Sequence, residues 1–292
     1  MIQHAKACLL AASLLASGCA NAPDAPRIDA GHPDGGEPEV RVSCQQMDVL
    51  FVIDNSASMQ QEQANLSENF DRFVESLRKF QDGSVDFRIG VTTTSFPTAL
   101  SEIGLVPPAA GGALLETADM SEPWLSSSDP DLSAKFRALA TVGTDGTEWN
   151  EQPLNALRSA LVDRVADRQN AGFLRPSALL ALVVLTDEDD LSSQNSGDIF
   201  NANVPIPVDD FIDDFDSLKG RREYWTAAVF AGGTAPKCDS MFGSALFASR
   251  LQSFVQQAGQ NAVFYSICDG DLSMGLDSAL STFSSACEFL LF

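Results

Sequence analysis

Three oxygen-bearing side chains follow a short apolar run early in the chain. In "LFVIDNSASM", residues 50–59, Asp54, Ser56 and Ser58 stand at alternate positions. A carboxylate and two hydroxyls are hard oxygen ligands, which suit Mg²⁺, Mn²⁺ or Ca²⁺. The same residues also have a purely structural interpretation, because Ser58 and Gln61 fit the S-x-x-Q capping box that begins a helix. The stretch therefore predicts either a cation site or an ordinary helix start.

A further carboxylate stands at a comparable place later in the chain. The run "ALLALVVL", residues 178–185, is the most apolar stretch beyond the first 20 residues, and "TDEDD" follows it. Such a run predicts a central strand, and binding groups in an open α/β sheet gather where the strands end. We therefore expect Asp187 to lie near Asp54 and to add a ligand. The acidic residues 188–190 are typical of a solvated loop, with a second cation as the alternative.

The composition excludes several classes of function. The chain has 292 residues, with 40 Asp and Glu against 18 Lys and Arg, which gives a net charge of −22. Nucleic acid and anionic membrane surfaces repel so acidic a protein, so the charge predicts cations or basic surfaces as partners. Both histidines, His4 and His32, precede the folded region, and no phosphate-binding glycine motif occurs. These features disfavour histidine-based catalysis and zinc chemistry, and we predict that the protein is not an enzyme.

The first residues predict export and a lipid anchor. Lys6 precedes the apolar run "ACLLAASLLA", which is too short to span a bilayer, and "ASG" leads into Cys19. This ending resembles a bacterial lipobox, which implies lipid attachment at Cys19, with plain secretion as the alternative. Ala20 follows the cysteine as in lipoproteins sent to an outer membrane. We predict a lipoprotein signal peptide over 1–18 and a flexible tether over 19–43, a segment rich in Pro, Gly and Asp.

Strand-like and helix-like patterns alternate through the rest of the chain. This alternation predicts an α/β fold in one domain, 44–292: a doubly wound, mostly parallel sheet flanked by helices on both faces. Between 96 and 150 we expect short edge strands and long loops, with one helix at "LSAKFRALA". The expected strands are 47–53, 85–95, 178–185, 224–231 and 261–268. One expected helix begins after residue 58, and the others cover about 152–168, 208–218, 244–259 and the last residues.

With these elements in order, the chain resembles the von Willebrand factor A-type domain. The metal-ion-dependent adhesion site of that family uses an Asp-x-Ser-x-Ser motif after the first strand, here Asp54, Ser56 and Ser58. It also uses an aspartate after the central strand, here Asp187. The resemblance implies a Rossmann-type three-layer fold over 44–292 and a bound Mg²⁺, Mn²⁺ or Ca²⁺. The glycine that usually follows the last aspartate is replaced by Glu188.

The resemblance also implies a ligand from a second loop, which in the family is a threonine. Counting back from Ala156 and Leu157 places Glu151 at this position, with Thr144 and Thr147 as fallbacks. A glutamate there would add negative charge and favour a site that also accepts Ca²⁺.

Four cysteines in an exported domain imply two disulfides, for which three pairings exist. The fold implied by the resemblance places Cys238 and Cys268 at the metal end of the sheet. It places Cys44 and Cys287 at the opposite end. The predicted disulfides are therefore Cys238–Cys268 and Cys44–Cys287.

The resemblance implies a function as an adhesion or protein-interaction module. On a lipid anchor at the cell envelope, it would hold a divalent cation and, through it, an acidic group of a protein partner. One alternative is an envelope scaffold with a degenerate metal site, which Glu151 and Glu188 favour. A metal-dependent hydrolase is the other alternative, since a bound cation can activate water, but no basic cluster for a phosphate adjoins the motif.

Overall fold

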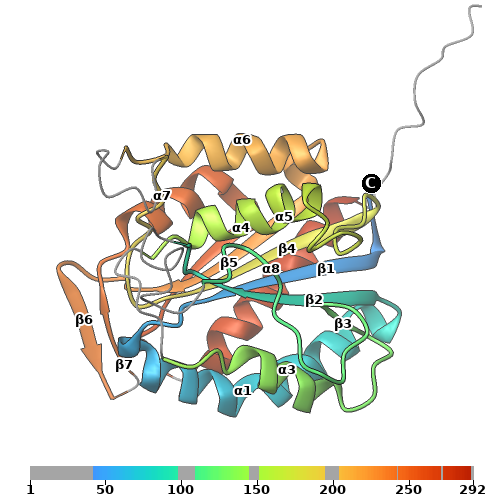
Figure 1. Ribbon diagram of the computed structural model, residues 1–292, viewed down its shortest axis with the longest axis horizontal. Coiled ribbons are helices and arrows are strands. Elements are labelled where there is room, and N and C mark those ends of the chain that lie inside the picture. Colours follow the sequence, from blue (N-terminus) through green and yellow to red (C-terminus); the bar gives the residue numbers. More distant parts are fainter. Residues whose placement is uncertain are drawn as a thin grey trace, which may run out of the picture. The chain divides into compact units, whose positions relative to one another are not determined.

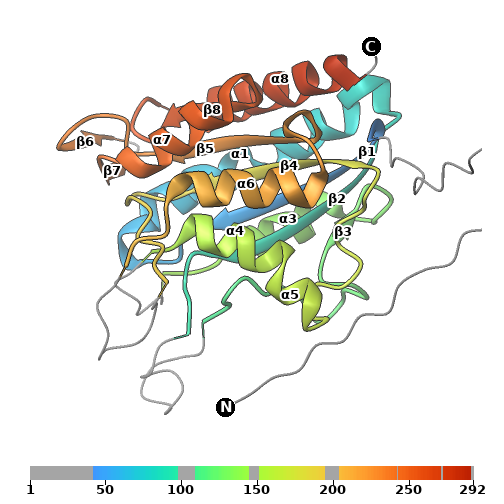
Figure 2. The same ribbon diagram turned by 90° about the horizontal axis from the view of Figure 1, so that it is seen from above.

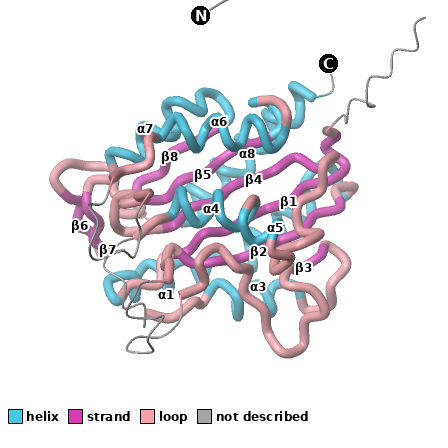
Figure 3. The backbone as a smooth tube through the Cα atoms, turned by 45° about the horizontal axis from the view of Figure 1, so that its top comes forward, coloured by secondary structure: helices cyan, strands magenta, loops and turns pink. Residues whose placement is uncertain are grey.

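The fold is built on a six-stranded sheet with the strand order β3-β2-β1-β4-β5-β8. In the computed structural model, the described residues are 42–97, 109–144, 151–194, 204–241, 243–270 and 272–290. The strands are β1 (Ser43–Ile53), β2 (Asp86–Thr93), β3 (Leu125–Ser126), β4 (Ala178–Leu185), β5 (Trp225–Ala231) and β8 (Ala262–Ser266). All neighbouring pairs are parallel except β3, which is antiparallel to β2. Figure 3 shows the strands side by side in this order, with β3 at one edge. The predicted fold class is confirmed.

The central strands are apolar because both of their faces are covered. Every residue of β4 is buried, and so is every residue of β5. A strand that is buried on both sides has no solvent-facing positions, which is why β4 reads as a continuous apolar run. β4 covers 178–185, the range predicted for it.

Helices cover the sheet in two layers (Figure 1). On one face lie α1 (Gln60–Lys79), α3 (Leu132–Ala140) and α8 (Leu272–Leu290), which pack with one side of the sheet into the first core cluster. On the other face lie α4 (Pro153–Leu161), α6 (Val208–Lys219) and α7 (Ser249–Ala258), which form the second cluster. Seen from above, α4 and α6 lie in front of the strands (Figure 2). The short helix α5 (Asp163–Ala166) follows α4 directly.

Two elements differ from the sequence prediction. The single helix expected over about 152–168 is divided into α4 and α5. The helix expected over 244–259 begins only at Ser249, and its first part forms β7 (Gly243–Leu246). β7 pairs with β6 (Lys237–Ser240) in an antiparallel hairpin outside the main sheet. The prediction was wrong here because "SALF" is compatible with an amphipathic helix, whereas the backbone pairing with β6 holds it as a strand.

Two disulfides join the folded region, and they are the predicted pairs. Cys44 at the start of β1 is bonded to Cys287 near the end of α8, and Cys238 in β6 is bonded to Cys268 just after β8. Within the described residues, no helix is both long enough and apolar enough to cross a bilayer. The predicted signal peptide, Cys19 and residues 20–41 of the predicted tether lie outside the described residues. The predicted end of the tether was wrong, because Val42 is buried and Ser43 begins β1.

Candidate metal site

The candidate site begins where β1 and β4 end side by side. Ile53 is paired with Leu185 in the sheet, and the backbone N–H of Asp54 donates a hydrogen bond to the Leu185 carbonyl oxygen at 2.9 Å. The next residues of each chain segment, Asp54 on one side and Thr186 with Asp187 on the other, therefore emerge together. The adjacency that the sequence predicted for Asp54 and Asp187 follows from this register.

Asp54 is fully buried and is held by protein donors. Its Oδ2 accepts a hydrogen bond from the Thr186 hydroxyl at 2.6 Å, and its Oδ1 accepts one from the Ser56 backbone N–H at 2.8 Å. Burial raises the pKa of Asp54, and the hydrogen bonds from Thr186 and Ser56 partly offset this rise. The carboxylate is thus fixed in orientation before any ligand binds.

The two serines link Asp54 to Asp187. The Ser56 and Ser58 hydroxyl oxygens are 3.0 Å apart, and Ser58 and Asp187 line the same pocket. Hydrogen bonds therefore join Asp54, Ser56 and Ser58, and Ser58 shares a pocket wall with Asp187. The alternative capping role is not found: a 3₁₀ turn, Ala57–Met59, precedes α1, and neither it nor α1 has a side-chain capping hydrogen bond.

Asp187 carries a buried oxygen atom without a protein partner. The side chain is 4 % exposed, and its Oδ1 atom has no hydrogen-bond partner among the described residues. Burial, followed by the nearby charge of Asp54, raises the pKa of Asp187 to about 7, against a smaller opposing effect of Ser58. Because leaving such an atom unpaired is costly, it points to a ligand at this position.

Glu151, the proposed second-loop residue, also reaches the site. It lies two residues before α4, is buried, and accepts a hydrogen bond from the Thr94 hydroxyl. Burial and then the charge of Asp54 raise the pKa of Glu151 to about 8, while the Thr94 hydrogen bond lowers it. Thr94 follows the end of β2, and Glu151 precedes α4. Both segments therefore contribute to the group of buried polar side chains around Asp54.

Of the two fallback residues for the second loop, the structure describes Thr144 but not Thr147. Thr144 is half-buried, and the carbonyl oxygen of its neighbour Gly143 accepts a hydrogen bond from Gln63 Nε2 at 2.7 Å. The same nitrogen donates to the Asp54 carbonyl oxygen at 2.9 Å, so this loop is tied to the motif by Gln63. Thr147 lies outside the described residues.

Sequence reasoning missed the two threonines and Gln63. Thr94 is the first residue after β2 and Thr186 is the first after β4, so a hydroxyl directly after a strand end was the available signal. Their role depends on which strands are neighbours, and that is visible only once the strand order is known.

Two of the three acidic residues that follow Asp187 have structural roles. Asp189 accepts hydrogen bonds from the backbone N–H groups of Arg250 and Leu251 in the first turn of α7. Asp190 is fully buried, accepts one from Leu154 N at the start of α4, and forms an ion pair with Arg250 at 3.0 Å. The prediction of a solvated loop was wrong for Asp190, because it bridges the starts of two helices.

The donor set fits a hard divalent cation that is bound partly through hydroxyls and water. Among the residues described, no three Asp, Glu, His or Cys side chains gather closely enough to hold a metal ion on their own. Asp54 and Asp187 with the hydroxyls of Ser56 and Ser58 form an all-oxygen set without imidazole or thiolate. The unpaired Oδ1 of Asp187 is the structural feature that such an ion, or a water molecule bound to it, would satisfy.

Comparisons with known proteins show only distant likeness. No protein-family model and no curated protein matches the chain. Similar solved structures include proximal thread matrix protein 1 from the mussel byssus, at 13 % identity and a TM-score of 0.46 over 85 % of this chain and 49 % of that chain. A structure of the same protein with a zinc-occupied MIDAS motif gives the same values.

The pilus adhesin SpaC from Lactobacillus rhamnosus GG, in its open conformation, is 11 % identical, with a TM-score of 0.45 over 86 % of this chain and 30 % of that chain. This chain thus spans about half of the mussel protein and less than a third of the adhesin. At this level of similarity, the fold assignment rests on the strand order described above.

Proposed function

We propose that this protein is a lipid-anchored module of the cell envelope that binds a divalent cation and, through it, an acidic group of a protein partner. The observation that carries this proposal is the junction of β1 and β4. There hydrogen bonds join Asp54, Ser56 and Ser58, and Ser58 lines one pocket with Asp187, whose buried Oδ1 has no partner among the described residues. We propose no catalytic role for these residues.

Each residue has a distinct part in the proposed binding. Thr186 and the Ser56 N–H orient Asp54, so that its carboxylate need not reorganise when a ligand arrives. Ser56 and Ser58 present their hydroxyls from alternate positions of one loop, and Asp187 closes the set from the neighbouring strand. When bound, the cation would supply an open coordination position for a carboxylate of the partner.

The net charge of the chain makes a bridging cation useful. At −22, the protein repels an acidic partner surface, and a cation held between two carboxylate-bearing surfaces turns this repulsion into attraction. Glu151 completes the proposed site from the second loop. Its bond with Thr94 keeps the glutamate near the other carboxylates. Lipid attachment at Cys19 and the tether over 19–43 would hold the module away from an outer membrane.

Calorimetry tests the cation site directly. Titration of the mature chain with Mg²⁺, Mn²⁺ or Ca²⁺ should show one bound equivalent, and Asp54→Ala should abolish the heat. Asp209→Ala, which removes an exposed carboxylate on α6, is the matched control and should bind as the wild type does. Absence of binding by all three ions at millimolar concentration would refute the proposed function.

The scaffold alternative is favoured by the buried glutamate at the second-loop position. Capture of partners from cell envelope with and without EDTA separates the two ideas. A cation-dependent module should lose its partner in EDTA and in Asp54→Ala. A scaffold should retain it in both, provided that circular dichroism shows the variant to be folded.

A further inference from the structure

A pocket of about 260 Å³ opens beside the candidate metal site. Its wall includes Asp187 from the candidate site, Glu62 from α1, and Ser244 with Leu246 from β7. Glu188 also lines it, so three carboxylates from two elements face one small space. None of the sequence motifs assigned a role to Glu62.

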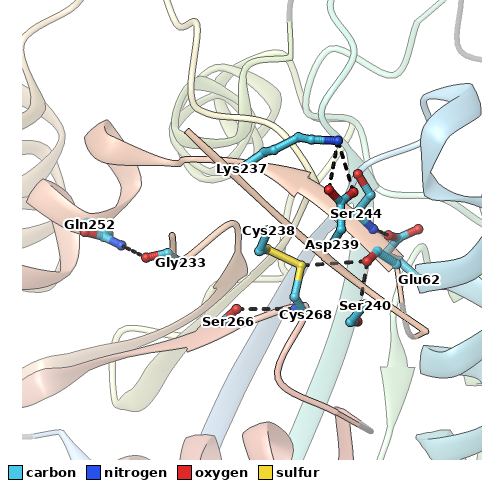
Figure 4. Close-up of a disulfide and its surroundings, with 11 residues drawn as sticks. Glu62, Gly233, Lys237, Cys238, Asp239, Ser240, Ser244, Gln252, Ser266 and Cys268 are labelled. Carbon is cyan, nitrogen blue, oxygen red and sulfur yellow. Dashed lines mark hydrogen bonds and ion pairs between the residues drawn. A yellow bond between two sulfur atoms is a disulfide. The ribbon is translucent and has the colours of Figure 1, made fainter. Parts of the chain in front are cut away.

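Glu62 is buried with only one of its carboxylate oxygens paired. The residue is 1 % exposed, and its Oε1 accepts a hydrogen bond from the Ser244 N–H at 3.0 Å, a contact shown in Figure 4. Its Oε2 has no hydrogen-bond partner among the described residues. Gly243 permits this close approach, because a Cβ atom there would lie 1.8 Å from Oε1. The glutamate is therefore locked in place with one acceptor left open.

β7 connects Glu62 to Asp187. The N–H of Leu246, two residues after Ser244, donates to the Asp187 carbonyl oxygen at 2.8 Å. Because alternate residues of a strand face the same way, Ser244 and Leu246 bring the two acidic residues to the same pocket. Each of these residues has one buried carboxylate oxygen without a partner, Glu62 Oε2 and Asp187 Oδ1.

The described protein supplies no positive charge to this pocket. None of the ion pairs formed by the described residues involves Glu62, Asp187 or Glu188. Lys237 of the adjoining hairpin pairs with Asp239 at 2.9 Å. A divalent ion at the candidate site would balance only part of the negative charge gathered here. The pocket therefore has the charge and the open acceptors of a cation-binding site.

We propose that this pocket binds the side-chain ammonium of a lysine on the protein partner, beside the acidic group that would complete the metal site. An ammonium has three donors and can reach single oxygens on different carboxylates; Glu62 Oε2 is the open acceptor here, and Glu188 lines the same pocket. A guanidinium instead matches both oxygens of one carboxylate, and Glu62 Oε1 is already taken by Ser244. The half-exposed Leu246 side chain offers an apolar wall for the lysine methylenes.

The inference relies on the proposed function for the source of the lysine, a protein partner. The preference for an ammonium rests on Glu62 and its unpaired oxygen. The two can therefore be tested separately. If both hold, the segment recognised on the partner carries an acidic and a basic side chain close together.

The test is an NMR titration of the mature chain with Nα-acetyl-lysine methylamide, repeated with the uncharged norleucine analogue. With either Mg²⁺ or EDTA present, the lysine probe should shift the amide signals of Ser244 and Leu246, and the norleucine probe should not. Glu62→Gln keeps an acceptor for the Ser244 N–H but removes the charge, and should weaken binding at least about tenfold. Glu68→Gln, on an exposed position of the same helix, should bind as the wild type does.

Three results would overturn the inference. These are equal shifts from both probes, unchanged binding by a folded Glu62→Gln variant, or a second equivalent of Mg²⁺ in calorimetry that Glu62→Gln removes. The last result would assign the pocket to a metal ion. Because the comparison of the two probes uses wild-type protein, it stands even if the variant does not fold. Failure of all Mg²⁺ binding would refute the proposed function and leave the response in EDTA intact.

Discussion

The Thr186 hydroxyl donates a 2.6 Å hydrogen bond to Asp54 Oδ2 across the junction of two parallel strands. A residue that follows the central strand thereby orients the first carboxylate of the motif that follows β1. The bond fixes the orientation of the Asp54 carboxylate, so any effect of Thr186 on the proposed cation would act through Asp54.

Thr186→Val should lower the affinity for Mg²⁺ by about tenfold to a hundredfold, the range typical of partners that orient a metal ligand. The substitution keeps the side-chain shape and removes the donor. Calorimetric titration measures the change. Thr226→Val is the control, because Thr226 is also fully buried and donates to the Asn261 carbonyl oxygen at 2.7 Å, away from the site. Equal affinity in both variants would show that Thr186 has no orienting role.

Without a divalent cation, the stability of the protein should fall as the pH rises from about 5 to about 8. The pKa of Asp187 rises from its ordinary 3.8 to about 7 in the fold, and that of Glu151 rises from 4.5 to about 8. In this window the folded state therefore binds more protons than the unfolded state. The stabilisation from these protons is fully present below the unfolded pKa values and is lost as the pH rises through the folded ones.

Thermal unfolding in EDTA at several pH values measures this slope. Mg²⁺ at pH 8 should raise the melting temperature, since the ion takes over the role of the protons. Glu151→Gln should flatten the slope in its upper part. A melting temperature in EDTA that increases between pH 5 and pH 8 would contradict the assignment of these groups.

The two disulfides should differ in what their removal affects. Cys44–Cys287 spans 243 residues and Cys238–Cys268 spans 30. On the chain-entropy estimate, the double serine variants should lose about 5 and about 4 kcal/mol of unfolding free energy, respectively. Only loss of Cys238–Cys268, which lies beside the β6–β7 hairpin (Figure 4), should also weaken binding of the lysine probe.

Denaturant unfolding and the NMR titration give the two measurements, and each variant is the control for the other. Weaker lysine binding after removal of Cys44–Cys287 would show that the probe reports on general stability. The pocket would then have no special dependence on the hairpin.

Gly243→Ala should be more destabilising than Gly259→Ala. Both glycines have positive φ angles, +142° and +71°, so alanine is strained at either position. A new Cβ meets nothing within 4 Å at Gly259, whereas at Gly243 it would collide with the Glu62 carboxylate. We expect about 1 kcal/mol at Gly259, from backbone strain alone, and a larger loss at Gly243. Equal unfolding free energies of the two variants would show that Glu62 can move aside.

The main sheet and the gathering of four candidate-site residues at its edge could be predicted from the sequence because they depend on local patterns. A fully buried parallel strand must be apolar throughout, so β4 stands out, and Asp187 follows from its end. Asp54, Ser56 and Ser58 are recognisable by spacing alone. Once the strand order is known, each cysteine can be placed at one of the two ends of the parallel sheet. This placement predicts which cysteines are paired.

Other features depend on contacts that no local pattern encodes. Asp190 reads as one more solvated acid until Arg250, 60 residues later, is seen beside it. "SALF" reads as part of a helix until its backbone pairing with β6 is known. Glu62 resembles any polar residue on an amphipathic helix, and only its contact with Ser244 shows that it is buried and half-paired.

The bond between Cys44 and Cys287 has a mechanical consequence. Tension that enters the domain from the side of residue 42 reaches Cys44 after two residues and then passes covalently to α8. A force applied between residue 42 and the end of α8 therefore bypasses the sheet. Such a force does not separate β1 from its neighbouring strands. With the bond intact, the 243-residue loop is spared an extension of about 800 Å. The end of the sheet that carries the candidate site would keep its geometry while the protein is under force.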